Sequence, residues 1–253
     1  MFLEITPMTF RVRVKPGISL SQLRLFYGDP TACEIHSPEL WNTVLHHPDC
    51  DGRANVGDTL SVDLLPTSVG QLQVAAFEAA AAAGVIDLWK RVESERPKPW
   101  LYWKFRNADE YQRLQINKGS FYILRSRERL RLPRGVAAYC RAIDETIGEM
   151  RIHYAGFVHP CFGFGRTDRP GTPLIFEVRG HDIDVSLIHR EKLAKLTFYR
   201  MSEDAQKDED GDGDKKAYDC QELHLSSYFA DWPTHLTLQN DGDVVPINSS
   251  LSS

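Results

Sequence analysis

The sequence predicts a mostly β fold, and three observations support this prediction. Apolar and polar residues alternate over short runs such as residues 10–14, which is the period of a half-buried strand. Turn-forming pairs such as Pro16-Gly17 separate these runs. The same order of strand, turn and strand also occurs twice, near the beginning of the chain and again after residue 175.

The composition is that of a globular protein. The chain has 253 residues, of which 42% are hydrophobic and 26% charged, and these values exclude wholly disordered, collagen-like and coiled-coil proteins. The longest apolar run, residues 74–86, is short and rich in alanine, so we expect no membrane span. The first residues do not read as a secretory signal, and an odd number of cysteines, five, fits a reducing compartment. We therefore expect a soluble, cytoplasmic protein.

The charge distribution argues against nucleic acid polymers as partners. The formal net charge is -5, and acidic residues concentrate in residues 203–214. A protein that relies on phosphate contacts along a polymer is expected to carry an excess of basic residues. A small phosphorylated ligand needs only a local basic cluster.

The first part of the chain is expected to contain strands and one helix. Residues 2–26 read as two strands around a turn, and residues 60–65 as a further strand. Residues 74–83 have strong helix propensity and are followed by Gly84, which predicts a helix. A polar, proline-rich passage then predicts a domain boundary near residue 95.

The second part is expected to contain further strands and a short helical turn at residues 136–140. The strands are expected over residues 121–132, 151–157, 174–178, 183–188 and 193–199. The two-residue period places four arginines of the first of these strands on one face: Arg125, Arg127, Arg129 and Arg131. This stripe fits a solvated strand face, an interface or a polyphosphate seat.

An internal repeat places a glutamate in the middle of an apolar strand in both copies. Residues 3–5, 10–14 and 20–26 correspond to residues 176–178, 183–187 and 193–199. The two glutamates are Glu4 and Glu177, and a carboxylate in such a strand is costly unless it has a partner or a task. Two interpretations of Glu177 stay open: a structural ion pair, for example with Arg179, or a functional carboxylate with a raised pKa.

Common cofactor motifs are missing or incomplete. The sequence contains neither a P-loop nor a dinucleotide fingerprint, and Pro160-Cys161 lacks the second thiolate of a zinc deaminase. Residues 208–219 have the ligand spacing of a calcium loop, but the last ligand is aspartate and no amphipathic helices flank it, which favours a solvated acidic loop. Scattered histidines such as His181 fit hydrogen-bonded structure better than metal ligands.

Four segments of the second part are specific in order and spacing: SFYILRSRERLRLP, GEMRIHYAGFVHPCFGFG, GTPLIFEVRGHD and AKLTFYRM. They resemble the deoxycytidine triphosphate deaminase family, in its long form with two tandem dUTPase-like copies. The resemblance implies a β-clip, a distorted double-stranded β-barrel that assembles as trimers or pseudo-trimers. It assigns residues 1–95 to a partial first copy plus linker, 96–232 to a complete copy and 233–253 to a disordered tail. It also implies an N-terminally truncated chain in which residues 74–83 are extended.

The resemblance further implies deamination of dCTP to dUTP and ammonia without a protein-bound metal. Glu177 is the expected base that activates water for attack on C4 of cytosine. Mg²⁺ would arrive on the triphosphate, and no zinc is expected. The expected substrate-binding residues are His153, Tyr154, Ala155, Gly156, His159, Arg179, Tyr218 and Gln221.

Several departures from the family pattern keep alternatives open. The family reads Asp-Pro-Gly where this chain has His159-Pro160-Cys161, and His224 and Ser227 stand where lysines are expected. One alternative is a catalytically degenerate β-clip protein that binds nucleotides or partners. dUTP pyrophosphate hydrolysis is disfavoured, because that chemistry needs the missing aspartate. We expect dCTP or dUTP and further copies of the chain as partners.

Overall fold

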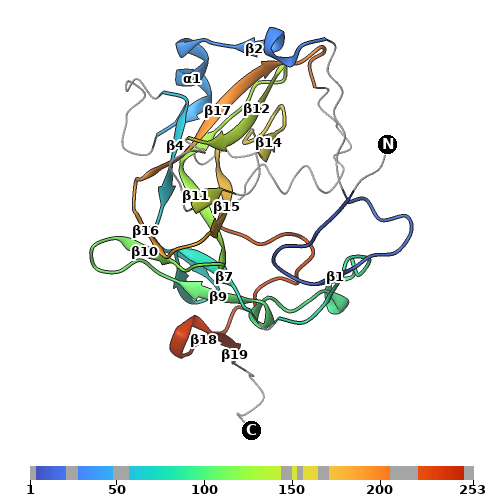
Figure 1. Ribbon diagram of the computed structural model, residues 1–253, viewed down its shortest axis with the longest axis vertical. Helices are drawn as coiled ribbons and strands as arrows, with labels where there is room; N and C mark the ends of the chain where they lie inside the picture. The colour runs from blue at the N-terminus through green and yellow to red at the C-terminus, as the bar shows by residue number, and fades with distance from the viewer. Residues whose placement is uncertain are drawn as a thin grey trace.

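The computed structural model describes residues 4–20, 28–47, 57–81, 83–143, 150–152, 156–164, 171–205 and 222–247 (Figure 1). The first strands are β1 (Val12–Arg13), β2 (Glu34–Ile35), β3 (Leu45–His46), β4 (Thr59–Asp63), β5 (Thr67–Val69), β6 (Leu72–Val74), β7 (Ala76–Ala79), β8 (Ile86–Asp87), β9 (Trp103–Arg106) and β10 (Arg113–Ile116). They are followed by β11 (Phe121–Leu130), β12 (Val136–Ala142), β13 (Met150–Ile152), β14 (Gly156–Val158), β15 (Thr172–Gly180), β16 (Val185–Ile188), β17 (Lys192–Arg200), β18 (Leu236–Leu238) and β19 (Val244–Pro246). The helices are α1 (Pro38–Val44) and the 3-10 helices η1 (Pro30–Cys33), η2 (Glu93–Glu95), η3 (Pro99–Leu101) and η4 (Asn240–Gly242). The predicted mostly β fold is confirmed.

A curled sheet organises the molecule. Within the described ranges, eleven strands join it, and its main path runs β13-β15-β11-β4-β17-β12-β14. Strand β11 also pairs with β3 and β7, and β9 continues the sheet from β7. In Figure 1 the sheet turns from β17, β12 and β14 at one end to β7 and β9 at the other. In this part of the chain no helix is long and apolar enough to cross a membrane.

One hydrophobic core fills the inside of the curl. Alternate residues of β17, namely Ala194, Leu196 and Phe198, are buried in it, as the period of a strand requires. Leu124 of β11 and Phe176 of β15 face the same core. The pattern that predicted strands from the sequence is therefore the pattern that fills this core.

A second core is largely aromatic and lies under β7 and β9. Phe77 and Phe105 contact each other there, and Trp103 contacts both Phe229 and Phe10 of the N-terminal segment. The following C-terminal residues form the β18–β19 hairpin, in which Leu236 and Val244 are only 1% and 2% exposed and pack into this core. Residues 236–246 are thus ordered by packing, whereas the sequence predicted a disordered tail from residue 233.

The predicted helix over residues 74–83 is wrong. Residues 76–79 form β7, which pairs with β11 on one side and β9 on the other. Phe77 is opposite both Ile123 and Phe105, and pairing at both edges outweighs the helix propensity of the alanines. The helical turn predicted over residues 136–140 is wrong for the same reason, because β12 lies between β17 and β14.

The strands predicted near the N-terminus are formed only in part. Among residues 4–20, the strand is β1, which pairs in parallel with β8, while Glu4 is exposed and outside any strand. The repeat in the sequence therefore does not place Glu4 in a sheet as it places Glu177. Strands β4 and β7 pair with β11, so the sheet crosses residue 95, and the division of the chain there stays a prediction.

Two glycines with similar backbone angles allow a matched test of the packing. Gly163 and Gly119 have φ of 77° and 72°, but a Cβ at Gly163 would collide with the carbonyl oxygen of Leu130, while a Cβ at Gly119 meets nothing within 4 Å. We predict that Gly163→Ala lowers the free energy of unfolding by about 2–4 kcal/mol, from backbone strain plus overpacking. Gly119→Ala should cost only ~1 kcal/mol of strain. Urea unfolding measures both, and equal losses would contradict the role assigned to Gly163.

Candidate active site

Glu177 lies in the middle of β15, between β11 and β13. It is directly opposite Ile123 of β11. Because side chains alternate along a strand, Glu177 shares its face of the sheet with Ile175 and Arg179. Cross-strand neighbours point to the same side, so Arg125, which is opposite Ile175, also belongs to this face.

The described neighbours of Glu177 on its face of the sheet include two isoleucines, Ile123 and Ile175. Ile123 and Ile175 belong to the aromatic core together with Leu223 and Phe229 of the C-terminal segment. Burial raises the pKa of Glu177, because the charged carboxylate loses its hydration there. Within the described part of the chain, no hydrogen bond or ion pair to Glu177 offsets this loss. A carboxyl group of this kind is suited to take up a proton.

Arg179 is not the ion-pair partner of Glu177. Its guanidinium donates hydrogen bonds to the carbonyl oxygen of Gly119 at 3.0 Å and to the carbonyl oxygen of Met8 and the hydroxyl of Thr9, both at 2.8 Å. These bonds attach the N-terminal segment to the sheet next to Glu177. The structural ion pair considered from the sequence is therefore absent between these two described residues.

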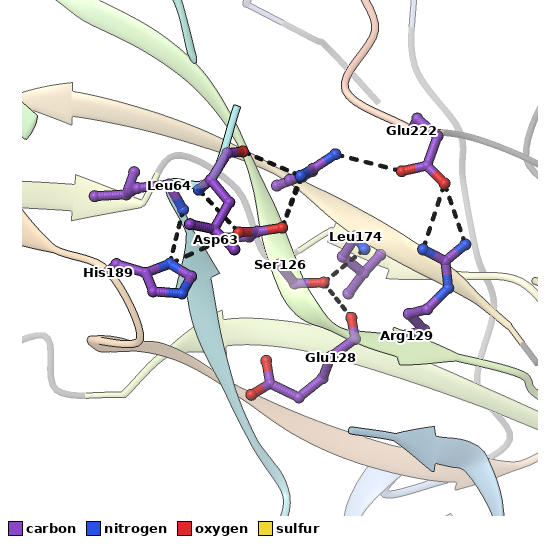
Figure 2. Close-up of polar contacts among 10 residues, drawn as sticks. Asp63, Leu64, Ser126, Glu128, Arg129, Leu174, His189 and Glu222 are labelled. Carbon is purple, nitrogen blue, oxygen red and sulfur yellow. Dashed lines mark hydrogen bonds and ion pairs between the residues drawn. The ribbon is translucent and has the colours of Figure 1, made fainter. Parts of the chain in front are cut away.

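An irregularity in β11 sets the register of β15. Arg125 is opposite Ile175 and Arg129 is opposite Pro173, so three residues of β11 face Leu174 alone. The Ser126 hydroxyl accepts the N–H of Leu174 at 2.8 Å and donates to the carbonyl oxygen of Glu128 at 2.6 Å (Figure 2). The hydroxyl thus replaces the ladder bond that the bulge interrupts.

Part of the arginine stripe is not solvated, although Arg131 is exposed. The side chains of Arg125 and Arg129 are only 11% and 13% exposed, and both contact the carboxylate of Glu222. Arg125 also forms an ion pair with Asp63 at 2.8 Å. The other two arginines of the stripe have different neighbours: Arg127 contacts His47, and Arg131 lies over the ring of Phe164.

Acidic residues that the sequence did not single out hold this part of the sheet together. The buried Glu128 accepts hydrogen bonds from the N–H and hydroxyl of Ser61, both at 2.6 Å. The backbone N–H of Leu64 donates to His189 Nδ1, which lies 3.7 Å from Asp63. The rule that flagged Glu177, a carboxylate within an apolar strand, does not find Glu128, because arginines flank Glu128 in the chain. The pairing of Asp63 and Glu222 with β11 is likewise visible only in three dimensions.

The other predicted site residues are not gathered around Glu177 in the described ranges. Gly156 is exposed on β14, and the exposed His159 after that strand packs edge-on against the ring of Phe157. Strand β14 pairs with β12, whereas β15 pairs with β11 and β13. The remaining predicted residues lie outside the described residues: His153, Tyr154, Ala155, Tyr218 and Gln221.

No metal centre is found in the part of the chain that the structure describes: no group of three or more His, Cys, Asp or Glu side chains is arranged to hold an ion. The loop with calcium-like spacing, residues 208–219, lies outside the described residues. Cys161 shows positive φ, 67°, at the turn where the resembled family has glycine.

Comparisons with known proteins show which family has this fold. The family model described as 2'-deoxycytidine 5'-triphosphate deaminase (DCD), C-terminal domain, matches residues 37–229. Among solved structures, the chain is similar to 2'-deoxycytidine 5'-triphosphate deaminase from Agrobacterium tumefaciens, with 26% identity and a TM-score of 0.56. The match covers 69% of this chain and 50% of that one, so the chain spans about half the length of this solved relative. A comparison with curated protein sequences found no match.

The raised pKa of Glu177 predicts a pH-dependent gain in stability for Glu177→Gln. Below the usual value of 4.5 the carboxyl is protonated in both folded and unfolded chains and costs nothing, whereas above its raised pKa the folded chain must bury a charge. The thermal midpoint of Glu177→Gln should therefore exceed that of the native chain at pH 7 and nearly equal it at pH 4. The exposed Glu110→Gln is the control and should show no such difference. An equal gain at both pH values would refute the burial cost.

Proposed function

Because the chain belongs to the 2'-deoxycytidine 5'-triphosphate deaminase family, we propose that it catalyses the hydrolytic deamination of dCTP to dUTP and ammonia. One observation carries this proposal beyond family membership. Glu177 is a carboxyl group whose burial raises its pKa, on the strand that resembles the family's catalytic segment. A general base near neutral pH needs such an environment.

The chemistry assigned to Glu177 is a proton shuttle. The carboxylate removes a proton from water, and the resulting hydroxide attacks C4 of the cytosine ring. The protonated Glu177 then gives its proton to the ring nitrogen. A second transfer, from the new hydroxyl to the leaving amine, releases ammonia and forms the C4 carbonyl of dUTP. The carboxylate is regenerated, so one residue serves as base and acid.

Substrate binding is proposed for the residues named from the family resemblance: His153, Tyr154, Ala155, Gly156, His159, Arg179, Tyr218 and Gln221. The location of the C-terminal segment supports this. Glu222 contacts the arginines on the Glu177 face of the sheet, and Leu223 and Phe229 are buried in the core that contains Ile123. A segment that already covers this face is suited to enclose a nucleotide against it.

We propose that magnesium arrives bound to the triphosphate, where it neutralises phosphate charge. We propose that zinc plays no part, because Pro160-Cys161 lacks the second thiolate of a zinc deaminase. Dialysis against a zinc-selective chelator should therefore leave dCTP deamination unchanged. Removal of magnesium should reduce it, with recovery on adding magnesium back. Stoichiometric zinc in the purified, active chain, shown by elemental analysis, would contradict this assignment.

The proposal includes assembly and location. We propose a cytoplasmic homo-oligomer, trimeric or pseudo-trimeric as in the resembled family, with active sites between copies. Gly156 lies on β14, which does not pair with β15, and His159 follows that strand, which supports sites completed by a neighbouring copy.

The second candidate function is nucleotide or partner binding without turnover. The turn His159-Pro160-Cys161 favours it, because the family's aspartate is replaced and Cys161 adopts the left-handed backbone that glycine tolerates best. Pyrophosphate hydrolysis of dUTP ranks below both, because it needs that aspartate. Ammonia release from dCTP separates deamination from both alternatives.

We predict that Glu177→Gln lowers the rate of ammonia release from dCTP on the order of a thousandfold, because the amide keeps the shape of the side chain but accepts no proton. A coupled ammonia assay measures the rate, and Glu110→Gln is the control with native turnover. Near-native activity in Glu177→Gln would show that Glu177 has a structural role and does not act as the base. Absence of ammonia release from the native chain, with dCTP binding retained, would favour the binding function instead.

A further inference from the structure

The N-terminal segment is attached to the face of the sheet that carries Glu177. Residues 8–13 of this segment, which we call the N-terminal strap, are bound there by Arg179, two residues from Glu177 along β15. At the rise of a strand this separation is about 7 Å. Both side chains belong to the same face of the sheet, because side chains alternate along a strand. The strap is therefore held beside the proposed base.

Arg179 attaches the strap through its guanidinium group. Nη2 donates to the carbonyl oxygen of Met8 and to the hydroxyl of Thr9, both at 2.8 Å, while Nη1 donates to the carbonyl oxygen of Gly119 at 3.0 Å. The acceptors are neutral, but the donor is charged, and hydrogen bonds from a charged donor are stronger than those between neutral groups. Because Gly119 belongs to the turn before β11, one side chain ties the strap to the sheet.

The ring of Phe10 is a second point of attachment. It packs edge-on against Trp103 and Phe229, with ring centroids 5.1 and 6.1 Å apart. Trp103 in turn lies 6.2 Å from the ring of Phe121, and the guanidinium of Arg179 lies over that same ring. Residues 8–10 are therefore held against the aromatic core at both ends of this short stretch.

The remaining part of the strap runs along β8. The carbonyl oxygens of Arg11 and Arg13 accept the N–H groups of Ile86 and Leu88 at 2.9 and 3.1 Å. Arg13 also forms an ion pair with Asp87 at 2.7 Å. These contacts do not involve Arg179, so loss of Arg179 is expected to release the beginning of the strap and not the whole N-terminal segment.

We propose that Arg179 is a positioning residue, which holds residues 8–10 of the strap as one wall of the site where a nucleotide meets Glu177. That the ligand is a nucleotide rests on the proposed function. A second wall is the C-terminal segment, which reaches the same core through Phe229 and touches the strap at Phe10. The contribution of Arg179 to nucleotide binding therefore passes through the strap.

Limited proteolysis of the full chain with trypsin tests whether Arg179 holds the strap. Arg11 is exposed, but cleavage after it requires the strap to detach, so the rate reports the detached fraction. Arg179→Gln should raise this rate about tenfold, and Thr9→Val, which loses one acceptor, should raise it less. Thr9→Ser keeps the hydroxyl and should restore the native rate. The exposed Arg200→Gln is the control, and a native rate in Arg179→Gln would overturn the proposal.

Protection by dUTP, the product of the proposed reaction, tests whether the strap is a wall of the site. At about ten times its Kd, dUTP should slow cleavage after Arg11 in the native chain about tenfold, because a ligand that binds only the attached form lowers the detached fraction. A native chain without protection would overturn the proposal. If dUTP protects the strap but dCTP releases no ammonia, the proposed function fails and the wall remains. If ammonia is released without protection, the wall fails and the proposed function remains.

Steady-state ammonia release separates positioning from direct contact with the nucleotide. Phe10→Ala loosens the strap and leaves Arg179 in place, so it should raise KM for dCTP about tenfold with little change in kcat, as Arg179→Gln does. If Arg179→Gln raised KM while Phe10→Ala and Thr9→Val kept native values, Arg179 would contact the nucleotide itself and the positioning role would be refuted. Thermal unfolding establishes that each variant is folded, and if Phe10→Ala is not, Thr9→Val decides.

Discussion

Pairing between β11 and β15 is the interaction on which the rest of the structure depends. Strand β11 is ten residues long and also pairs with β3, β4 and β7, so segments from distant parts of the sequence meet along it. Its bulge, closed by the Ser126 hydroxyl, decides which residue of β15 faces which residue of β11. If the pairing shifted by one residue, Glu177 would point into the inner core. Every other side chain of β15 would also move to the opposite face of the sheet.

The two faces of this pair have different environments, and the contrast explains the chemistry proposed for the chain. The inner face carries Leu124 and Phe176 into the aliphatic core. The outer face carries Glu177 among Ile123 and Ile175, with Arg125 and Arg129 beside it. Glu177 shares this face with guanidinium groups that are paired with acids, and burial keeps its carboxyl group hard to ionise.

The turn His159-Pro160-Cys161 has a backbone shape that favours glycine, while its side chains differ from the family pattern. Its backbone is held by hydrogen bonds from the N–H of Cys161 to Leu132 and from the N–H of Phe162 to His159. With the turn held by these hydrogen bonds, Cys161 has a positive φ, which glycine adopts most easily. Shape alone therefore supports membership of the fold, and function has to be judged at Glu177 and at the arginines.

The sequence by itself determined strands β11, β15, β16 and β17, the oddity of Glu177 and the resemblance to a family, because alternation and motif spacing are local properties of the chain. It misjudged residues 74–83, whose alanines favour a helix until β9 and β11 offer hydrogen bonds on both edges. It also misjudged the tail, because the burial of Leu236 depends on a distant aromatic core. Which acids neutralise Arg125 and Arg129 was decided only by the tertiary structure, since Asp63 and Glu222 come from opposite sides of β11 in the sequence and meet it through pairing and packing alone.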